Sequence, residues 1–379
     1  MIGLRDHSLF GVDVVVNGTP LLVMIDNYFL MSTKTYKILS TTSFLIALCF
    51  LISGCSQKGT FVYTVEDAPG YNCWPMIQSI GNRLVCVYTM GKHHDTSEKG
   101  RGAYARYSDD GAKSWSERIL IDDNPEYGTS SIGKGMDSDG NALFWIRRMN
   151  AGPRMALYRT GDGRTFELIS TPPLDPNPMQ ITDIFHTPDG LECLWFSDDY
   201  SDDNDNKSWG ALISKDNGLN WEQRVIERDL PKKDWPTEPS VAVIGDGCLL
   251  AVARSEMEGG HQFQLTSYDW GKTWTKSTTN IGDVLQSTPT LIYDRNKGLI
   301  YNYYYQRGAG LLKVRTALVK DILEDGSAWP EPRIIAEGGR ERPYDSGNAN
   351  AVAIKDRHFI TYYSGDSVNC SVLVATEKK

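Results

Sequence analysis

Apolar and polar residues alternate along many short segments of the chain, as they do at 102–107 and 262–266. This period of two residues is typical of β-strands that bury one face. Residue pairs that favour tight turns, such as Asp-Gly, separate the strand-like segments at six places. The six turns are Gly81-Asn82, Asp139-Gly140, Asp189-Gly190, Asp246-Gly247, Asn296-Lys297-Gly298 and Asp356-Arg357. The pattern therefore predicts six antiparallel hairpins.

A short segment that contains Asp and Gly and closes with an aromatic residue follows five of these hairpins. The five copies are 108–115, 160–166, 214–221, 267–274 and 322–329. Their closing aromatic residues lie 51, 55, 53 and 55 residues apart, a period typical of a solenoid, a propeller or an array. We expect Asp and Gly to shape a turn and the aromatic side chain to be buried, so that these segments have a structural role.

One hairpin and one repeated segment together make four antiparallel strands, which is the blade of a β-propeller. The last unit, from about Ser346, is too short for a fourth strand, but residues 60–65 ahead of the first unit could supply it and close the ring. The predicted fold is an all-β, six-bladed β-propeller that forms a single domain over residues 55–379.

The N-terminal region has the features of an export signal. Lys34 and Lys37 precede an apolar run at 44–52 that ends in small residues before Cys55. This ending resembles a bacterial lipobox, which implies that Cys55 is lipidated. We expect residues 1–30 to be an over-extended start and 31–54 to be the signal peptide. The alternative, a transmembrane anchor, is weaker because the apolar run is short of about 20 residues.

These features predict an exported lipoprotein, anchored through its lipid at the outer membrane, in the periplasm or at the cell surface. The net charge of −9 argues against nucleic acid as a partner. Five cysteines follow Cys55, and their odd number and spacing predict neither a disulfide framework nor a metal site. We expect no cofactor, and we expect a monomer because a closed propeller leaves no sheet edge to cover.

The predicted topology restricts a binding site to one rim. The connections between strands 2 and 3 and between successive blades share that rim, and they are the long, polar ones. Arginines and tyrosines that converge there suit an anionic ligand, because guanidinium binds carboxylate through two parallel hydrogen bonds. The alternative is an ordinary solvated rim. Candidates for ligand contact are Trp74, His93, Arg101, Tyr304 and Arg307.

One pair of residues can be placed by counting from a turn. Glu238 lies eight residues before Asp246, and Arg254 lies eight residues after it. Equal distances from a hairpin turn place two residues opposite each other on neighbouring strands. We therefore expect Glu238 and Arg254 to meet at the site rim, either as part of a site or as an ordinary cross-strand ion pair.

With these motifs in place, the chain resembles the sialidase (neuraminidase) superfamily over nearly all of residues 55–379. The repeated segment is similar to the Asp-box, or BNR repeat, of that superfamily, and residues 238–254 resemble its central blade. The resemblance implies a glycoside hydrolase that removes terminal sialic acid with retention of configuration through a tyrosine nucleophile. It also implies an acidic oligosaccharide or glycoconjugate as the ligand.

The resemblance implies roles for particular carboxyl and hydroxyl groups. Asp95, with Glu98 as the reserve, stands where the family has its acid/base residue. Glu238 stands where the family has the base that activates the nucleophile. The tyrosine itself belongs about eight residues before the last hairpin turn, where this chain has Asn348. The nearest tyrosine is Tyr344, which is the candidate nucleophile.

The family binds the carboxylate of the sugar with three arginines. Arg254 matches the second of these, and Arg307 is nearest to the third, with Arg315 deeper in the strand. Cys73 occupies the position of the first arginine. This departure, and the one at Asn348, keep three hypotheses open. They are a sialidase-type exo-glycosidase, a propeller hydrolase or lyase that acts on another acidic glycan with a histidine base, and a non-catalytic glycan-binding lipoprotein.

Overall fold

The computed structural model describes residues 10–16, 19–25, 60–197, 205–338, 346–366 and 368–379. The chain forms two compact units, Met1–Gln57 and Lys58–Lys379. Within the first unit, strand β1 (Phe10–Val16) pairs antiparallel with β2 (Thr19–Ile25). Cys55 and the apolar run at 44–52 lie outside the described residues, so the lipidation remains a prediction.

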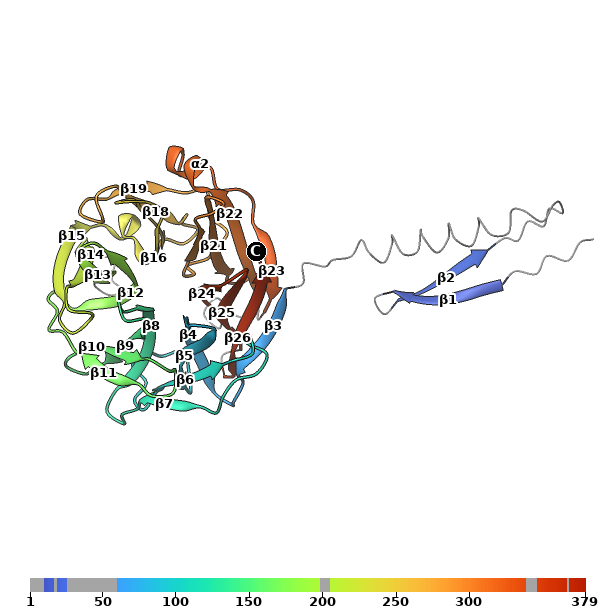
Figure 1. Ribbon diagram of the computed structural model, residues 1–379, viewed down its shortest axis with the longest axis horizontal. Helices are drawn as coiled ribbons and strands as arrows, with labels where there is room; N and C mark the ends of the chain where they lie inside the picture. Colours follow the sequence, from blue (N-terminus) through green and yellow to red (C-terminus); the bar gives the residue numbers. More distant parts are fainter. Residues whose placement is uncertain (1–9, 17–18, 26–59, 198–204, 339–345, 367) are drawn as a thin grey trace, which may run out of the picture. The chain divides into compact units, whose positions relative to one another are not determined.

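The second unit is a β-propeller, whose four-stranded antiparallel sheets are arranged around a centre (Figure 1). The first separate sheet contains β8 (Gly128–Met136), β9 (Ala142–Met149), β10 (Met155–Thr160) and β11 (Glu167–Ser170). The second contains β12 (Pro178–Thr187), β13 (Gly190–Ser197), β14 (Lys207–Ser214) and β15 (Glu222–Leu230). The third contains β16 (Thr237–Val243), β17 (Leu249–Arg254), β18 (Phe263–Ser267) and β19 (Thr275–Thr278). The fourth contains β20 (Thr290–Asp294), β21 (Leu299–Gln306), β22 (Leu311–Leu318) and β23 (Arg333–Glu337).

The two ends of the propeller chain meet in one larger sheet. Its C-terminal half contains β24 (Ser346–Ile354), β25 (Arg357–Gly365), β26 (Cys370–Lys378) and β3 (Phe61–Glu66). Its other half contains β4 (Tyr71–Ile80), β5 (Arg83–Gly91), β6 (Gly102–Ser108) and β7 (Ile119–Asp122). β3 pairs antiparallel with β26, whereas β26 and β4 share a single parallel bridge between Cys370 and Tyr71. The prediction that residues 60–65 complete the C-terminal unit is confirmed.

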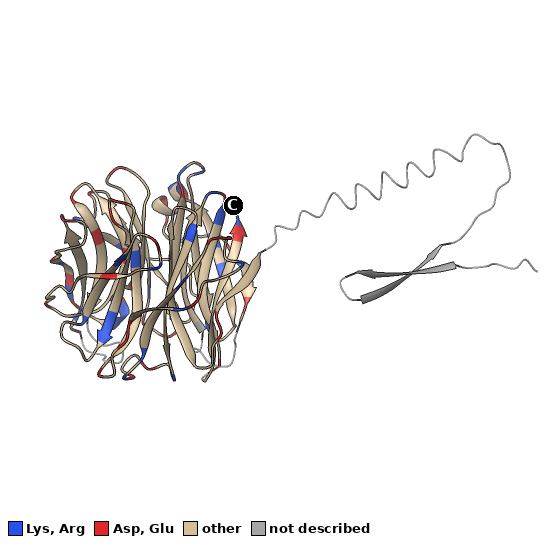
Figure 2. Ribbon diagram, turned by 60° about the horizontal axis from the view of Figure 1, so that its bottom comes forward, with Lys and Arg blue, Asp and Glu red and all other residues tan. Residues whose placement is uncertain are grey.

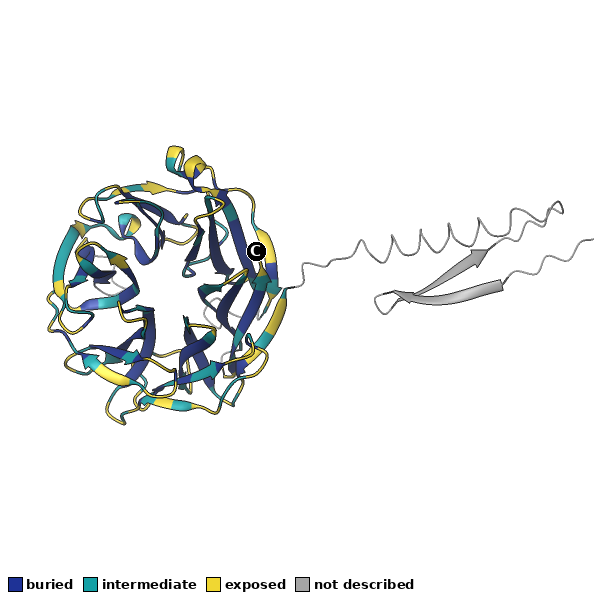
Figure 3. Cartoon of the chain, viewed as in Figure 1, coloured by how far each residue is buried: buried dark blue, intermediate teal, exposed yellow. Residues whose placement is uncertain are grey.

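The first strand of each four-stranded set lies nearest to the centre. β4, β8, β12, β16, β20 and β24 contact one another in a closed cycle. The inner and middle strands are largely buried, whereas the outer strands are more exposed (Figure 3). Charged residues of both signs are interspersed along the propeller when it is viewed from the side (Figure 2). Among the described residues, no helix is long and apolar enough to cross a membrane.

The repeated segments form the tight turns that the sequence predicts. The Asp110 carboxylate accepts hydrogen bonds from the Ser108 hydroxyl at 2.9 Å and the Ser114 backbone N–H at 3.0 Å. These bonds, led by one from the Ser114 hydroxyl, lower the pKa of Asp110 to about 2. The copy at 214–221 also places its aromatic residue against the preceding sheet, because Trp221 packs on Trp145 with ring centroids 5.3 Å apart.

The fifth copy keeps the turn but not the opening of the motif. Helix α2 (Val319–Glu324) covers the first residues of the copy, and residue 322, where an intact copy has its opening serine, is a buried isoleucine. Without that serine, the capping hydroxyl is missing, and Ile322 packs into the core instead. The rest of the motif is retained. Asp325 Oδ1 accepts hydrogen bonds from the Ser327 backbone N–H at 2.9 Å and the Ser327 hydroxyl at 2.7 Å, and Trp329 is 2% exposed and donates a hydrogen bond to Gln264.

Candidate functional site

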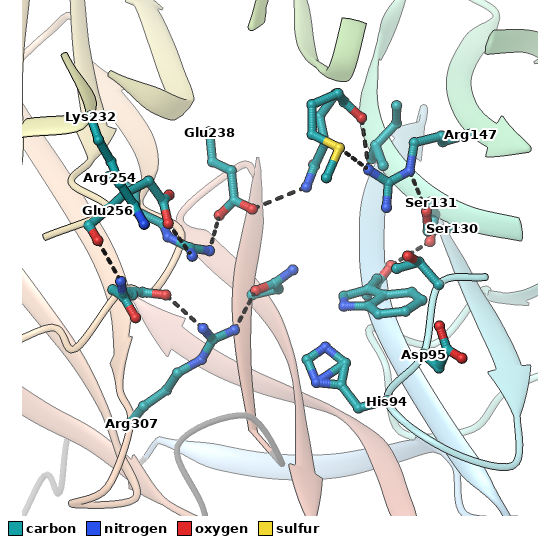
Figure 4. Close-up of a pocket in the computed structure, with 17 residues that line it drawn as sticks. His94, Asp95, Ser130, Ser131, Arg147, Lys232, Glu238, Arg254, Glu256 and Arg307 are labelled. Atoms are coloured by element: carbon teal, nitrogen blue, oxygen red, sulfur yellow. Dashed lines mark hydrogen bonds and ion pairs between the residues drawn. The ribbon is translucent and has the colours of Figure 1, made fainter. Parts of the chain in front are cut away.

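A cavity of about 460 Å³ opens at the rim formed by the connections between strands 2 and 3 and between blades. Its walls carry four cationic side chains and three carboxylates. These are Arg147, Lys232, Arg254 and Arg307, and Asp95, Glu238 and Glu256. Figure 4 shows Lys232, Glu238, Arg254 and Glu256 on one side of the cavity, opposite His94, Asp95 and Arg147. The cavity therefore lies at the rim that the sequence predicts.

The blade that contains β16 and β17 contributes an arginine held by two carboxylates. Arg254 Nη1 lies 3.2 Å from Glu238 Oε2, and Arg254 Nη2 lies 2.9 Å from Glu256 Oε2. The expected meeting of Glu238 and Arg254 is thus observed, but the strand register differs by one residue. The backbone partner of Arg254 is Thr237, because the ladder shifts between Thr237 and Ser240. This bulge turns Glu238 toward the cavity.

Glu238 is buried and ionised. Its Oε2 accepts hydrogen bonds from Arg254 and from the Thr288 hydroxyl at 2.5 Å, and its Oε1 accepts one from Gln180 at 3.1 Å. Burial alone would raise the pKa of Glu238. The charge of Arg254, the Thr288 hydrogen bond and the charge of Arg307 outweigh burial and lower this pKa below its ordinary value.

Arg307 follows β21 and joins three neighbouring segments. Its Nη1 donates to the Gln286 carbonyl at 2.6 Å, and its Nη2 donates to Asn348 Oδ1 at 3.1 Å. The Gln286 side chain in turn donates to the Glu256 carbonyl at 2.7 Å. Arg307 and Gln286 therefore connect Asn348 on β24 to Glu256, two residues after β17, and these bonds fix the guanidinium at the cavity wall.

Trp74 forms an aromatic wall of the cavity. It has a left-handed backbone with φ of 50°, and its indole lies between His94, with ring centroids 5.4 Å apart, and Arg101, whose guanidinium carbon lies 5.0 Å from the ring centroid. His94 also stacks on Tyr71 at 5.5 Å. Desolvation in this aromatic stack, followed by the positive charges of Arg307 and Arg101, lowers the pKa of His94 to about 4. The imidazole is therefore neutral at pH 7.

Asp95 is an exposed carboxylate at the edge of the cavity. Its Oδ1 accepts hydrogen bonds from the Ser97 hydroxyl at 2.7 Å and from the Ser97 backbone N–H at 2.8 Å. These two bonds lower the pKa of Asp95 below its ordinary value. The carboxyl group is consequently ionised at neutral pH and carries a proton only in acid. Glu98, the reserve candidate, is instead tied to Arg101 at 3.0 Å and does not line the cavity.

Five of the predicted site residues come together around the cavity. They are Trp74, Asp95, Glu238, Arg254 and Arg307. Cys73, at the position of the missing arginine, is fully buried and lies 3.4 Å from Arg101 Nη1. Tyr344 lies outside the described residues.

Three other predicted ligand contacts need correction. Tyr304 is fully buried, and its hydroxyl lies 3.0 Å from both Asp283 and Arg315, because both faces of its strand are covered by neighbouring sheets. Arg101 is also fully buried, beneath Trp74. His93 is exposed but does not line the cavity, and its backbone carbonyl accepts a hydrogen bond from Arg101.

Several cavity residues were not assigned as site residues from the sequence. Lys232 lies in the 3-10 helix η1 (Lys232–Asp234), immediately before the inner strand β16. Gln180, near the start of β12, lines the cavity, and Thr288, two residues before β20, lines a smaller neighbouring cavity; both donate hydrogen bonds to Glu238. Their common signal is position, since each lies within a few residues of Glu238 or of its counterpart in another blade.

The described residues hold no group of three or more His, Cys, Asp or Glu side chains placed to bind a metal. The cysteines in this part of the chain, from Cys73 to Cys370, are free thiols.

Residues 201–346 match the BNR repeat-like domain. A protein of unknown function from Dyadobacter fermentans has a similar structure, with 19% identity, a TM-score of 0.64, and coverage of 84% of this chain and 99% of that one. The K499G mutant of NanB sialidase from Streptococcus pneumoniae is similar at 12% identity and a TM-score of 0.61, over 86% of this chain and 72% of that one.

The sialidase of Trypanosoma rangeli, in a complex with 2,3-difluorosialic acid described as a covalent intermediate, is similar at 11% identity and a TM-score of 0.56. That match covers 82% of this chain but only 56% of the T. rangeli chain. No curated protein sequence matches the chain. At these identities the structural matches show a sialidase-like propeller fold, and the BNR repeat-like match agrees with it.

Proposed function

We propose that this protein is a glycosidase that hydrolyses a terminal acidic sugar, sialic acid or a related one, from glycans. The observation that carries the proposal is a single cavity in which Arg254 and Arg307 lie with Asp95, Glu238 and the indole of Trp74. Such a cavity provides cations for a carboxylate, an aromatic side chain in its wall, and carboxylates on both sides for proton transfer.

Arg254 and Arg307 are the contacts for the carboxylate of the sugar. Both guanidinium groups line the cavity and are held in place by hydrogen bonds, Arg254 to Glu238 and Glu256, and Arg307 to Asn348 and the Gln286 carbonyl. Lys232 adds a further positive charge to the wall. A hydrogen bond to a charged group contributes about 1.5–3 kcal/mol, enough to select acidic sugars over neutral ones.

Asp95 and Glu238 take the proton-transfer roles. Asp95 lies in the exposed loop after β5, from which it can protonate the leaving oxygen of the aglycone. Glu238, on the inner strand β16, is ionised and can accept a proton from the group that attacks the sugar.

The propeller is proposed to have six blades. This count treats the eight-stranded sheet as two blades, since its halves share one bridge between Cys370 and Tyr71, and it agrees with the closed cycle of inner strands. Export, lipidation at Cys55, membrane anchoring and a monomeric state remain part of the proposal on the sequence features described above.

A second candidate is a hydrolase or lyase that acts on another acidic glycan. The observation in its favour is that Cys73 and Asn348 replace an arginine and a tyrosine of the sialidase pattern, while His94 lines the cavity as a neutral ring that can accept a proton. A lyase produces a C=C bond that absorbs ultraviolet light, so product absorbance separates it from a hydrolase. Binding of a glycan panel without turnover supports a glycan-binding protein instead.

The proposal is tested by release of fluorescence from a 4-methylumbelliferyl sialoside. We expect turnover by the purified protein and a loss of about 10- to 100-fold in kcat/KM for Arg307→Ala, mostly through KM, because a charged hydrogen-bond pair to the substrate is removed. Arg159→Ala is the matched control, since Arg159 pairs with Glu167 away from the cavity. Absence of turnover by folded protein contradicts the proposal.

A further inference from the structure

Three inner strands each direct one side chain into the cavity, and all three do so with the same backbone conformation. Trp74, Glu238 and Asn348 all have left-handed backbones, with φ of 50°, 47° and 45°. At each of them the ladder to the next strand shifts, and all three side chains line the cavity. Non-glycine residues rarely adopt this conformation, so its repetition at one position in three blades indicates a shared role in the cavity wall.

At this position of the last blade the chain carries a carboxamide. Arg307 has only donors, so the atom of Asn348 that faces Arg307 Nη2 at 3.1 Å must be the amide oxygen. The Thr288 hydroxyl also lies within 3.2 Å of this oxygen. The other polar atom of the side chain is then an N–H₂ group, which can donate hydrogen bonds but is not a nucleophile.

Glu238, the carboxylate that could accept a proton from an attacking group, is nevertheless present next to this position. Thr288 Oγ1 lies 2.5 Å from Glu238 Oε2 and 3.2 Å from Asn348 Oδ1, so a single hydroxyl connects the two residues. Glu238 is thus an ionised carboxylate that Thr288 connects to the carboxamide of Asn348, and both residues line the cavity of about 460 Å³. A carboxylate next to a polar donor is suited to hold and deprotonate a water molecule.

We propose that hydrolysis at this site is a single displacement by water, with inversion of configuration, and that Asn348 positions this water for Glu238. The inference rests on the proposed function. The water oxygen forms a bond to the anomeric carbon while one of its protons passes to Glu238. The glycosidic C–O bond breaks, and its electron pair goes to the leaving oxygen, which takes a proton from the acid form of Asp95. Exchange of protons with solvent restores both carboxyl groups.

The first experiment is ¹H NMR of the sugar released from an α-sialoside in the first minutes of the reaction. Inversion gives the β-anomer as the first product, whereas a double displacement gives the α-anomer, which then mutarotates. In parallel, the protein is incubated with 2,3-difluorosialic acid and its intact mass is measured. We expect the β-anomer first, an unchanged mass, and inhibition of the reporter reaction that disappears completely on dilution.

Each other outcome has a definite meaning. An α-anomer as first product, or a stable mass increase whose peptide map leads to Tyr344 or to another side chain, overturns the single displacement and leaves the proposed glycosidase in place. No turnover of any sialoside contradicts the proposed function and this inference together. Asn348→Ala should lower kcat at least tenfold, while the first product remains the β-anomer. The matched control is Asn296→Ala, in an exposed turn. An unchanged kcat for Asn348→Ala removes Asn348 from the positioning role.

Discussion

The two rims of the propeller are made by the same four-stranded unit. One rim repeats the same side chains in several blades, whereas the other carries different side chains at equivalent positions. On one rim the repeated turns use equivalent side chains in several blades: Asp110, Asp216 and Asp269 each accept hydrogen bonds from the residue four positions later. On the other rim, equivalent positions hold Trp74, Glu238 and Asn348, which differ in chemistry. The repeated rim keeps the blades folded, and the varied rim is where the proposed chemistry takes place.

The two rims also differ in where their charged side chains find hydrogen-bond partners. The turn aspartates Asp110 and Asp216 accept hydrogen bonds within their own segments, and their pKa values are lowered by side-chain donors, Ser114 for Asp110 and Asn220 for Asp216, and by backbone donors. Glu238 and Arg307 also bond to residues of other blades, Glu238 to Thr288 and Arg307 to Asn348. Changes at the repeated rim should therefore affect stability alone, whereas changes at the varied rim should affect turnover.

The largest expected effect is that of Glu238→Gln. This change keeps the size of the side chain but removes the proton acceptor, so kcat should fall by about 10²- to 10⁴-fold. Kinetics with the fluorescent sialoside measure it, with Glu167→Gln on the opposite rim as the matched control. A kcat within twofold of the native value would place Glu238 among ordinary ion-pair residues and would weaken the contrast between the rims.

A second expected effect is a decline of activity with rising pH. The pKa of Asp95 lies below its ordinary value, so the fraction of its acid form falls about tenfold for each pH unit above that pKa. The value of kcat/KM for a substrate with a poor leaving group, such as sialyllactose, should fall accordingly from pH 4 upward. The decline should be weaker with the umbelliferyl reporter, whose leaving oxygen needs less protonation. Equal profiles for the two substrates would show that Asp95 is not the acid.

Much of the fold could be predicted because its signals are local. Turn residues and alternating segments identified the hairpins, and the missing fourth strand of the last unit pointed to residues 60–65, which pair with β26. The fifth repeat was predicted correctly at its Asp325 turn and its buried Trp329, but its opening position, Ile322, lies in a short helix that the spacing did not predict. The spacing of repeats carries no information about such a local replacement.

The site could be predicted only where counting from a turn sufficed. Glu238 and Arg254 were found in this way, although the bulge at Glu238 shifts the register by one residue. Tyr304 was misplaced because it lies in a middle strand, where both faces pack against neighbouring sheets, so its side chain belongs to the core. Lys232 was missed because its place depends on the path of the connection between two blades, which no spacing in the sequence defines.

The smallest expected effect lies on the repeated rim and completes the contrast. Asp216 accepts hydrogen bonds from the Asn220 backbone at 2.8 Å, from the Asn220 side chain at 2.6 Å and from Ser214 at 2.9 Å. Asp216→Ala should lower the free energy of unfolding by about 1 kcal/mol, since donors near solvent regain part of their bonding with water. Urea denaturation measures this loss, and Asp356→Ala, which removes an exposed carboxylate on the same rim, should change stability by less than about 0.5 kcal/mol. Because Asp216 bonds only within its own turn in these contacts, kcat and KM should stay at native values, and a change in either would show that the two rims are coupled.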